Sequence, residues 1–296
     1  MNSKNCDFTT PCSTFLDSLA DCKHYVNFIK WRLYEARERT EQTLNSLKAT
    51  GNAENYFTGT GLPIVNVFHK GDYVTRAPSG KRITSGKNLI ILTEEMERRF
   101  NANLISVIHE RLADFLKAMY ANMLQTLPHL LSDEDKVEFH RRQQGMEAKD
   151  GTPEYFRHYA KCCSGKDCSK AVAAMLKELP WDEVHICIWN GMTFDKMVGM
   201  LAFCRHCIVH EEGRTSPEAM NRLDKAQANF VEKWLFTPVH GTDPLILPDT
   251  QSVERAMEAF ASFAYALYLL MSKRCGVDVE ILFFERPVET QAAIEA

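Results

Sequence analysis

The amino-acid sequence predicts an all-α fold, a helical bundle with loop or short β-hairpin insertions. Apolar residues recur at helical spacing over several long segments, whereas strand-like patterns are confined to one short region. The composition is that of an ordinary globular chain, because 45% of the 296 residues are hydrophobic and 25% are charged. Such a chain can bury a large core and is not intrinsically disordered. We therefore expect 1–296 to form a single α-helical domain.

Two long helices are expected in the first half of the chain. The first covers 13–50, with Ser13 as a candidate N-cap and Gly51 as a candidate C-terminal stop. The second begins at Thr93, where glutamates follow in the first turn, and ends before Pro128.

Irregular segments separate the expected helices. Residues 51–92 contain turn clusters, and within them LPIVNVF and YVTR predict a short hairpin. Residues 128–165 are polar, and we expect an irregular insertion there. The remaining helices are expected at 167–179, 190–212, 216–236 and 250–275.

The charge, the apolar runs and the cysteine content indicate which partners and which cellular compartment to expect. The formal net charge is -4, so any contact with a nucleic acid has to come from a local basic patch. The chain has no apolar run of 18 residues, and its first residues lack the apolar core of a signal peptide. Ten cysteines without an export signal favour reduced thiols in the cytoplasm.

The segment LAFCRHCIVHEEGR, 201–214, belongs to the most apolar of the expected helices. At about 100° per residue, four side chains fall within roughly 40° of one line and predict a core face. They are Met197, Leu201, Cys204 and Ile208. The opposite side carries small, aromatic and histidine residues, namely Gly199, Ala202, Phe203, His206 and His210. A helix that is apolar or small on all sides is normally buried on all sides, either inside a bundle or at a subunit interface.

Arg205 carries the only fixed charge between 197 and 209. It is five residues before His210, about 140° around an ideal helix, so we expect the two not to lie side by side within one chain. In a symmetric dimer, each Arg205 could instead meet the His210 of the other chain. His206 is four residues before His210 and shares its face. Gly213 suits the left-handed position that follows a helix.

The string RHCIVH, Arg205 to His210, resembles the R-x4-6-H motif of the HEPN superfamily (higher eukaryotes and prokaryotes nucleotide-binding domains). The wider string FCRHCIVHEEG is similar to the common R-N-x-x-V-H pattern of that family, except that His206 stands where asparagine is more frequent. The similarity covers about 93–275, and its specific part is the six-residue string.

The resemblance implies a metal-independent endoribonuclease without a cofactor, acting at a dimer interface. Arg205 would hold the scissile phosphate, and His210 would act as acid or base. His206 is the alternative base, and the resemblance leaves that choice open. Glu110 is the candidate for an acidic position that faces the arginine in such bundles, and Glu211 is a further supporting candidate.

The resemblance also implies partners. They are an RNA substrate, a second copy of the chain, and an antitoxin or regulatory protein, since many members of the superfamily serve in toxin–antitoxin, phage-defence or RNA-processing systems.

The residue types agree with this chemistry. RNA is cleaved when its 2′-OH loses a proton, the pentacoordinate phosphate is stabilised and the 5′-oxygen gains a proton. A histidine titrates in the right range for both proton transfers, and a guanidinium gives a phosphate two donors while it stays charged. DNA lacks the 2′-OH and would not be cut by this route.

Two other interpretations remain open. The first is a non-catalytic helical module for interaction or nucleotide binding. The second is a zinc-stabilised regulatory protein that uses Cys204, Cys207 and the two histidines, or the cluster Cys162, Cys163 and Cys168. In a continuous helix, however, Cys204 and His206 lie about 160° apart, so one ion cannot easily bind both.

Overall fold

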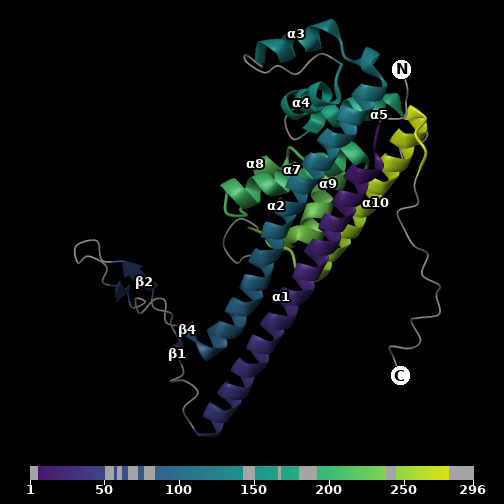
Figure 1. Ribbon diagram of the computed structural model, residues 1–296. Helices are drawn as coiled ribbons and strands as arrows, with labels where there is room; N and C mark the ends of the chain where they lie inside the picture. The colour runs from purple at the N-terminus through teal and green to yellow at the C-terminus, as the bar shows by residue number, and fades with distance from the viewer. Residues whose placement is uncertain are drawn as a thin grey trace, which may run out of the picture.

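The computed structural model describes residues 6–50, 57–58, 62–65, 73–76, 84–142, 151–165, 168–179, 192–237 and 245–279. The described part of the chain is a bundle of α-helices with short two-stranded sheets (Figure 1). The all-α prediction is confirmed.

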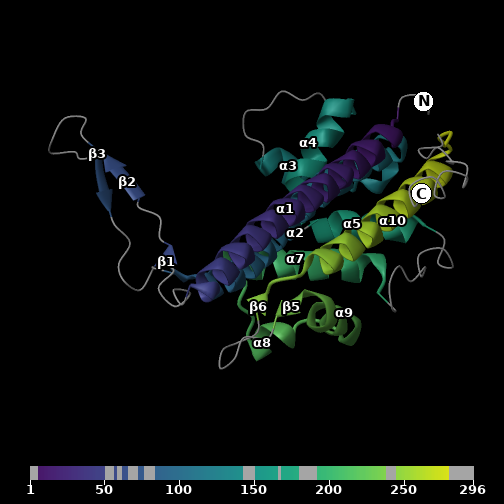
Figure 2. The ribbon, with the colours of Figure 1, turned by 90° about the horizontal axis from the view of Figure 1, so that it is seen from below.

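Three long helices lie side by side and form the frame of the molecule (Figures 1 and 2). They are α1 (Thr9–Ala49), α2 (Gly86–Thr126) and α10 (Thr250–Cys275). Helix α1 runs in one direction, and α2 and α10 return in the other (Figure 1). The bounds of α10 agree with the prediction, because Asp249 caps the N-terminus and Gly276 adopts φ 66° after the last turn. Helices α1 and α2 each begin several residues before the predicted start.

Aromatic and aliphatic side chains from all three long helices fill the core between them. Phe15 of α1 stacks on Phe115 of α2 with ring centroids 5.3 Å apart. Phe263 of α10 packs 4.5 Å from Phe194, at the start of a shorter helix, α7 (Phe194–His210). Each of these four rings is at most 3% exposed, and full burial of such a side chain contributes about 1.5–3 kcal/mol. The core therefore fixes α7 against the frame.

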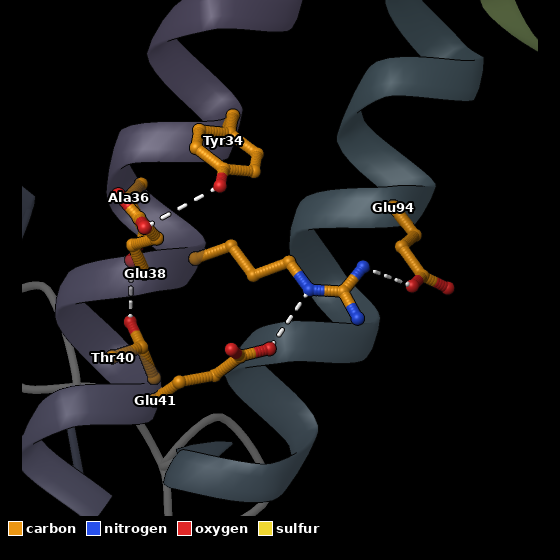
Figure 3. A network of polar contacts seen from close by, with 7 residues as sticks. Tyr34, Ala36, Glu38, Thr40, Glu41 and Glu94 are labelled. Atoms are coloured by element: carbon orange, nitrogen blue, oxygen red, sulfur yellow. Dashed lines mark hydrogen bonds and ion pairs between the residues drawn. The ribbon is translucent and has the colours of Figure 1, made fainter.

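The distal half of α1, after residue 28, has fewer buried side chains than the proximal half, and they are Thr40 and Leu44. No side chain of α1 is buried between Val26 and Thr40. This stretch contacts α2 partly through Arg37, which donates to Glu41 of its own helix and to Glu94 of α2, both at 2.9 Å (Figure 3). Exposed ion pairs of this kind contribute little to stability. Most of the stability of the α1–α2 pair therefore comes from its proximal half.

The prediction of an irregular insertion over 128–165 is wrong. The segment contains a 3₁₀ turn (Pro128–Leu130), α3 (Asp133–Arg142) and α4 (Pro153–Cys163). Thr152 accepts a hydrogen bond from the backbone N–H of Tyr155 and caps α4, with Pro153 at the first helical position. Helix α4 packs one apolar face on α2, and its buried residues are Tyr155, Phe156, Tyr159, Ala160 and Cys163.

The prediction of one helix over 216–236 is also wrong. The segment is divided into α8 (Pro217–Met220), α9 (Lys225–Phe230) and a π-helical turn (Val231–Leu235). Asp224 starts α9 with a capping box, in which its carboxylate accepts the N–H of Gln227 and the Gln227 side chain accepts the N–H of Asp224. Helix α5 (Ser169–Glu178) lies close to its predicted place at 167–179.

The strands are short and antiparallel. The predicted hairpin is confirmed, because β2 (Leu62–Val65) pairs with β3 (Tyr73–Arg76). Strand β1 (Phe57–Thr58) pairs with β4 (Thr84–Ser85), and β5 (Phe236–Thr237) pairs with β6 (Leu245–Ile246). Among the described residues, no helix has the length and apolar character needed to cross a membrane.

Candidate functional site

One face of α7 belongs to the core, as predicted. Met197, Leu201 and Cys204 are fully buried, and Ile208 is partly buried. Burial strongly raises the pKa of the Cys204 thiol, which therefore stays protonated at neutral pH. This face holds α7 in place and leaves the opposite face available for other contacts.

The opposite face of α7 is not buried within one chain, so the expectation that the bundle interior covers it is wrong, and burial at a subunit interface stays a prediction. It forms the floor of an open pocket of about 660 Å³. Helix α5 provides one wall of the pocket, and the α8–α9 segment provides another. The α7 residues that line it are Asp195, Val198, Gly199, Ala202, Phe203, Arg205, His206 and His210. Helices α5 and α9 flank this face without covering it, so His206 and His210 stay exposed.

Arg205 and His210 lie side by side, so the expectation that they stay apart within one chain is wrong. Nη1 of Arg205 is 3.3 Å from Nε2 of His210 in the same chain. The long arginine side chain spans the angle between the two Cα positions. The His206 and His210 rings lie with their centroids 5.0 Å apart, as their four-residue spacing predicts. One guanidinium and two imidazoles therefore gather at the end of α7.

The end of α7 is formed by two successive residues with positive φ, Glu212 at 55° and Gly213 at 85°. The N–H of Gly213 donates to the carbonyl of Cys207 at 2.8 Å, which satisfies one of the last carbonyls of the helix. The Gly213 carbonyl in turn accepts the N–H of Ile246 at 2.8 Å. The left-handed conformation predicted for Gly213 is confirmed, and this turn fixes His210 as the last helical residue.

The other predicted site residues lie apart from this group. Glu110 is exposed on α2 and does not line the pocket, and Glu211 is exposed just beyond α7. The structure adds Arg222, which lines the pocket from the turn between α8 and α9. No sequence motif connects Arg222 with Arg205, so only the packing of α9 against α7 could identify it.

The charge of the pocket favours an anion. The described residues that line it bring two guanidiniums and two imidazoles but one carboxylate, Asp195, which accepts a hydrogen bond from the Thr193 hydroxyl at 2.6 Å. Among the described residues, neither Arg205 nor Arg222 makes an ion pair with a carboxylate. Both guanidiniums can therefore donate to a ligand, and a guanidinium matches the geometry of a phosphate or a carboxylate with two parallel hydrogen bonds.

The two α7 cysteines of the zinc interpretation do not line the pocket. Cys204 is fully buried and Cys207 is 2% exposed, so both belong to the core, whereas His206 and His210 line the opposite face. Among the residues that the structure describes, no three His, Cys, Asp or Glu side chains come close enough together to hold a metal ion.

No protein-family model matches this chain, and no curated protein or solved structure matches it.

Proposed function

We propose that this protein is a metal-independent endoribonuclease of the HEPN type. One observation carries the proposal: the 3.3 Å contact between Arg205 and His210, in an open pocket whose described lining has more basic side chains than carboxylates. The resemblance of RHCIVH to the R-x4-6-H motif supports the same reaction.

Each step of RNA cleavage has a group in this pocket. A neutral imidazole takes the proton of the 2′-OH, and the 2′-oxygen attacks the adjacent phosphorus. The bond from phosphorus to the 5′-oxygen breaks, and an imidazolium donates a proton to that oxygen. The products are a 2′,3′-cyclic phosphate and a free 5′-OH. The Arg205 guanidinium neutralises the charge that accumulates on the phosphate oxygens in the transition state.

The two histidines suit the two proton transfers. His210 is next to the Arg205 guanidinium and so lies close to the phosphate that this guanidinium would bind. The ring of His206 is 5.0 Å away on the same face. If one imidazole acts as base and the other as acid, the rate should depend on pH as a bell-shaped curve.

The test is cleavage of a labelled RNA in the presence of EDTA, with the 2′,3′-cyclic phosphate end detected by mass spectrometry. His210→Ala and Arg205→Ala should each lower kcat by about 10²- to 10³-fold, the usual effect of removing a proton-transfer group or a transition-state donor. His24→Ala, a change at an exposed histidine of α1, is the matched control and should cleave at the wild-type rate. Undiminished cleavage by both pocket variants would overturn the proposal.

Because Arg205 and His210 meet within one chain, the proposed site does not need a second copy of the chain to bring them together. Because Arg205 and His210 come from the same α7, a monomer holds both groups. Homodimerisation through the exposed face of α7 stays a separate prediction, which sedimentation at micromolar concentration tests. A cytoplasmic role in defence or stress response, with an antitoxin or regulatory partner, is proposed from the family resemblance alone.

A further inference from the structure

The α8–α9 wall of the pocket is fixed to α7 by specific contacts. The Gln227 amide donates to the carbonyl of Lys196 at 2.7 Å. The Lys196 ammonium forms an ion pair with Asp224 at 3.0 Å. Gly199 allows this approach, because a Cβ at that position would lie 3.3 Å from Nε2 of Gln227. The wall is therefore held in a defined position against α7.

This wall brings a second guanidinium to the pocket. Arg222 lines the pocket from the turn between α8 and α9, and its side chain bonds no residue within the described part of the chain. Arg205 lines the same pocket from α7. The two guanidiniums therefore come from different elements and line one pocket.

Part of the pocket surface is apolar. Val172 of α5, Ala202 and Phe203 of α7, and Leu223 of the α8–α9 turn line it. Apolar and aromatic side chains of this kind pack on the faces of unstacked bases. A volume of about 660 Å³ is within the range of pockets that enclose small ligands.

We propose that the pocket takes one nucleoside of a single-stranded RNA, with its base on the apolar surface and its two flanking phosphates on Arg205 and Arg222. The inference rests on the proposed function in taking RNA as the ligand. Arg222 is then a phosphate-binding residue. A base can reach the apolar surface only when it is unstacked and unpaired, so the site selects single strands over duplexes.

The test measures binding without cleavage. A fluorescent RNA oligonucleotide with 2′-O-methyl groups cannot undergo 2′-OH attack, and its affinity is measured by anisotropy as a single strand and as a duplex. Wild type should bind the single strand at least tenfold more tightly than the duplex. Arg222→Ala should weaken binding of the single strand about tenfold and reduce the salt dependence by about one phosphate contact.

Three further variants sharpen the result. Arg222→Lys should recover part of the affinity, because it keeps the charge and loses the bidentate geometry. Phe203→Ala should weaken binding of the single strand more than binding of the duplex. Arg157→Ala, which removes the same charge from an exposed position of α4, should bind like wild type.

The outcomes separate the two proposals. Equal affinity for single strand and duplex, or an unchanged affinity in Arg222→Ala, would overturn the inference about the pocket. If the single strand binds as expected but wild type leaves an unmodified RNA intact, the pocket assignment stands and the nuclease proposal fails.

Discussion

Gly199 and Gln227 should be energetically coupled, because the close approach of α9 to α7 depends on both. Gly199→Ala removes a glycine from the interior of α7, which alone should stabilise the protein by about 1 kcal/mol. The new Cβ would lie 3.3 Å from Nε2 of Gln227, closer than such contacts normally are. Gln227 cannot retreat freely, because it donates to the Lys196 carbonyl at 2.7 Å and accepts from the Asp224 N–H at 2.8 Å.

The expected change in the free energy of unfolding is the sum of these two opposing effects. Weakening one of the two hydrogen bonds costs about 1 kcal/mol, and weakening both costs about twice that. In the wild-type background, Gly199→Ala should therefore be neutral or destabilising by about 1 kcal/mol. In the Gln227→Ala background the crowding is absent, so the same change should stabilise by about 1 kcal/mol. The coupling energy is expected to be about 1–2 kcal/mol.

Urea unfolding followed by circular dichroism gives the four free energies of this double-mutant cycle. Ala202→Gly, a substitution on the same face of α7 that creates no crowding, serves as a control and should cost about 1 kcal/mol in both backgrounds. If Gly199→Ala changes the free energy of unfolding equally with and without Gln227, the close contact between the two residues does not affect the packing of α9 on α7, and the reasoning is wrong.

Three other predictions concern stability. Asn101 is 1% exposed, and its amide donates to the Pro248 carbonyl at 3.2 Å. Asn101→Ala should therefore lower the free energy of unfolding in urea by about 1–3 kcal/mol, and an unchanged urea midpoint would contradict this. Burial opposes ionisation of Asp224, but hydrogen bonds from Gln227, Lys196 and Ala226 lower its pKa overall. The Asp224 charge therefore stabilises the fold at neutral pH, and this stabilisation is lost as the pH falls below about 4. The difference in melting temperature between wild type and Asp224→Asn should accordingly shrink between pH 7 and pH 3, and a constant difference would exclude the charge as its cause. Arg37→Ala should leave the melting temperature almost unchanged, because both of its ion pairs are exposed; a large decrease would show that the bridge from α1 to α2 is a main support.

The long helices could be predicted because their apolar spacing is maintained over many turns. The start of α4 was also marked in the sequence, since Thr152, Pro153 and Glu154 form a typical N-terminal signal. This signal was overlooked because residues 128–165 are mostly polar and were therefore expected to be irregular. Predicting a single helix over 216–236 overlooked Asp224, whose capping box starts α9 after a break. Local signals were thus present in both segments that were predicted wrongly.

The site could be predicted only in part. The sequence places Arg205, His206 and His210 within six residues, so a motif can find them. Arg205 and His210 were expected to stay apart because their Cα positions differ by about 140° around the helix. That expectation failed because it neglected the length of the arginine side chain, which reaches His210. Arg222 lies 17 residues beyond Arg205, and tertiary contacts such as that of Gln227 with Lys196 bring it to the pocket.

The uneven burial along α1 should give this helix a gradient of local stability. Side chains such as Phe15 and Leu19 are anchored in the core, whereas none is buried between Val26 and Thr40. Backbone amides in a helix exchange with solvent when the helix opens, and opening costs less where few apolar contacts are lost. Amides of 27–39 should therefore exchange deuterium orders of magnitude faster than those of 15–22. One continuous helix would then unfold in two stages, and its distal half could open and close while the framework that holds α7 remains intact.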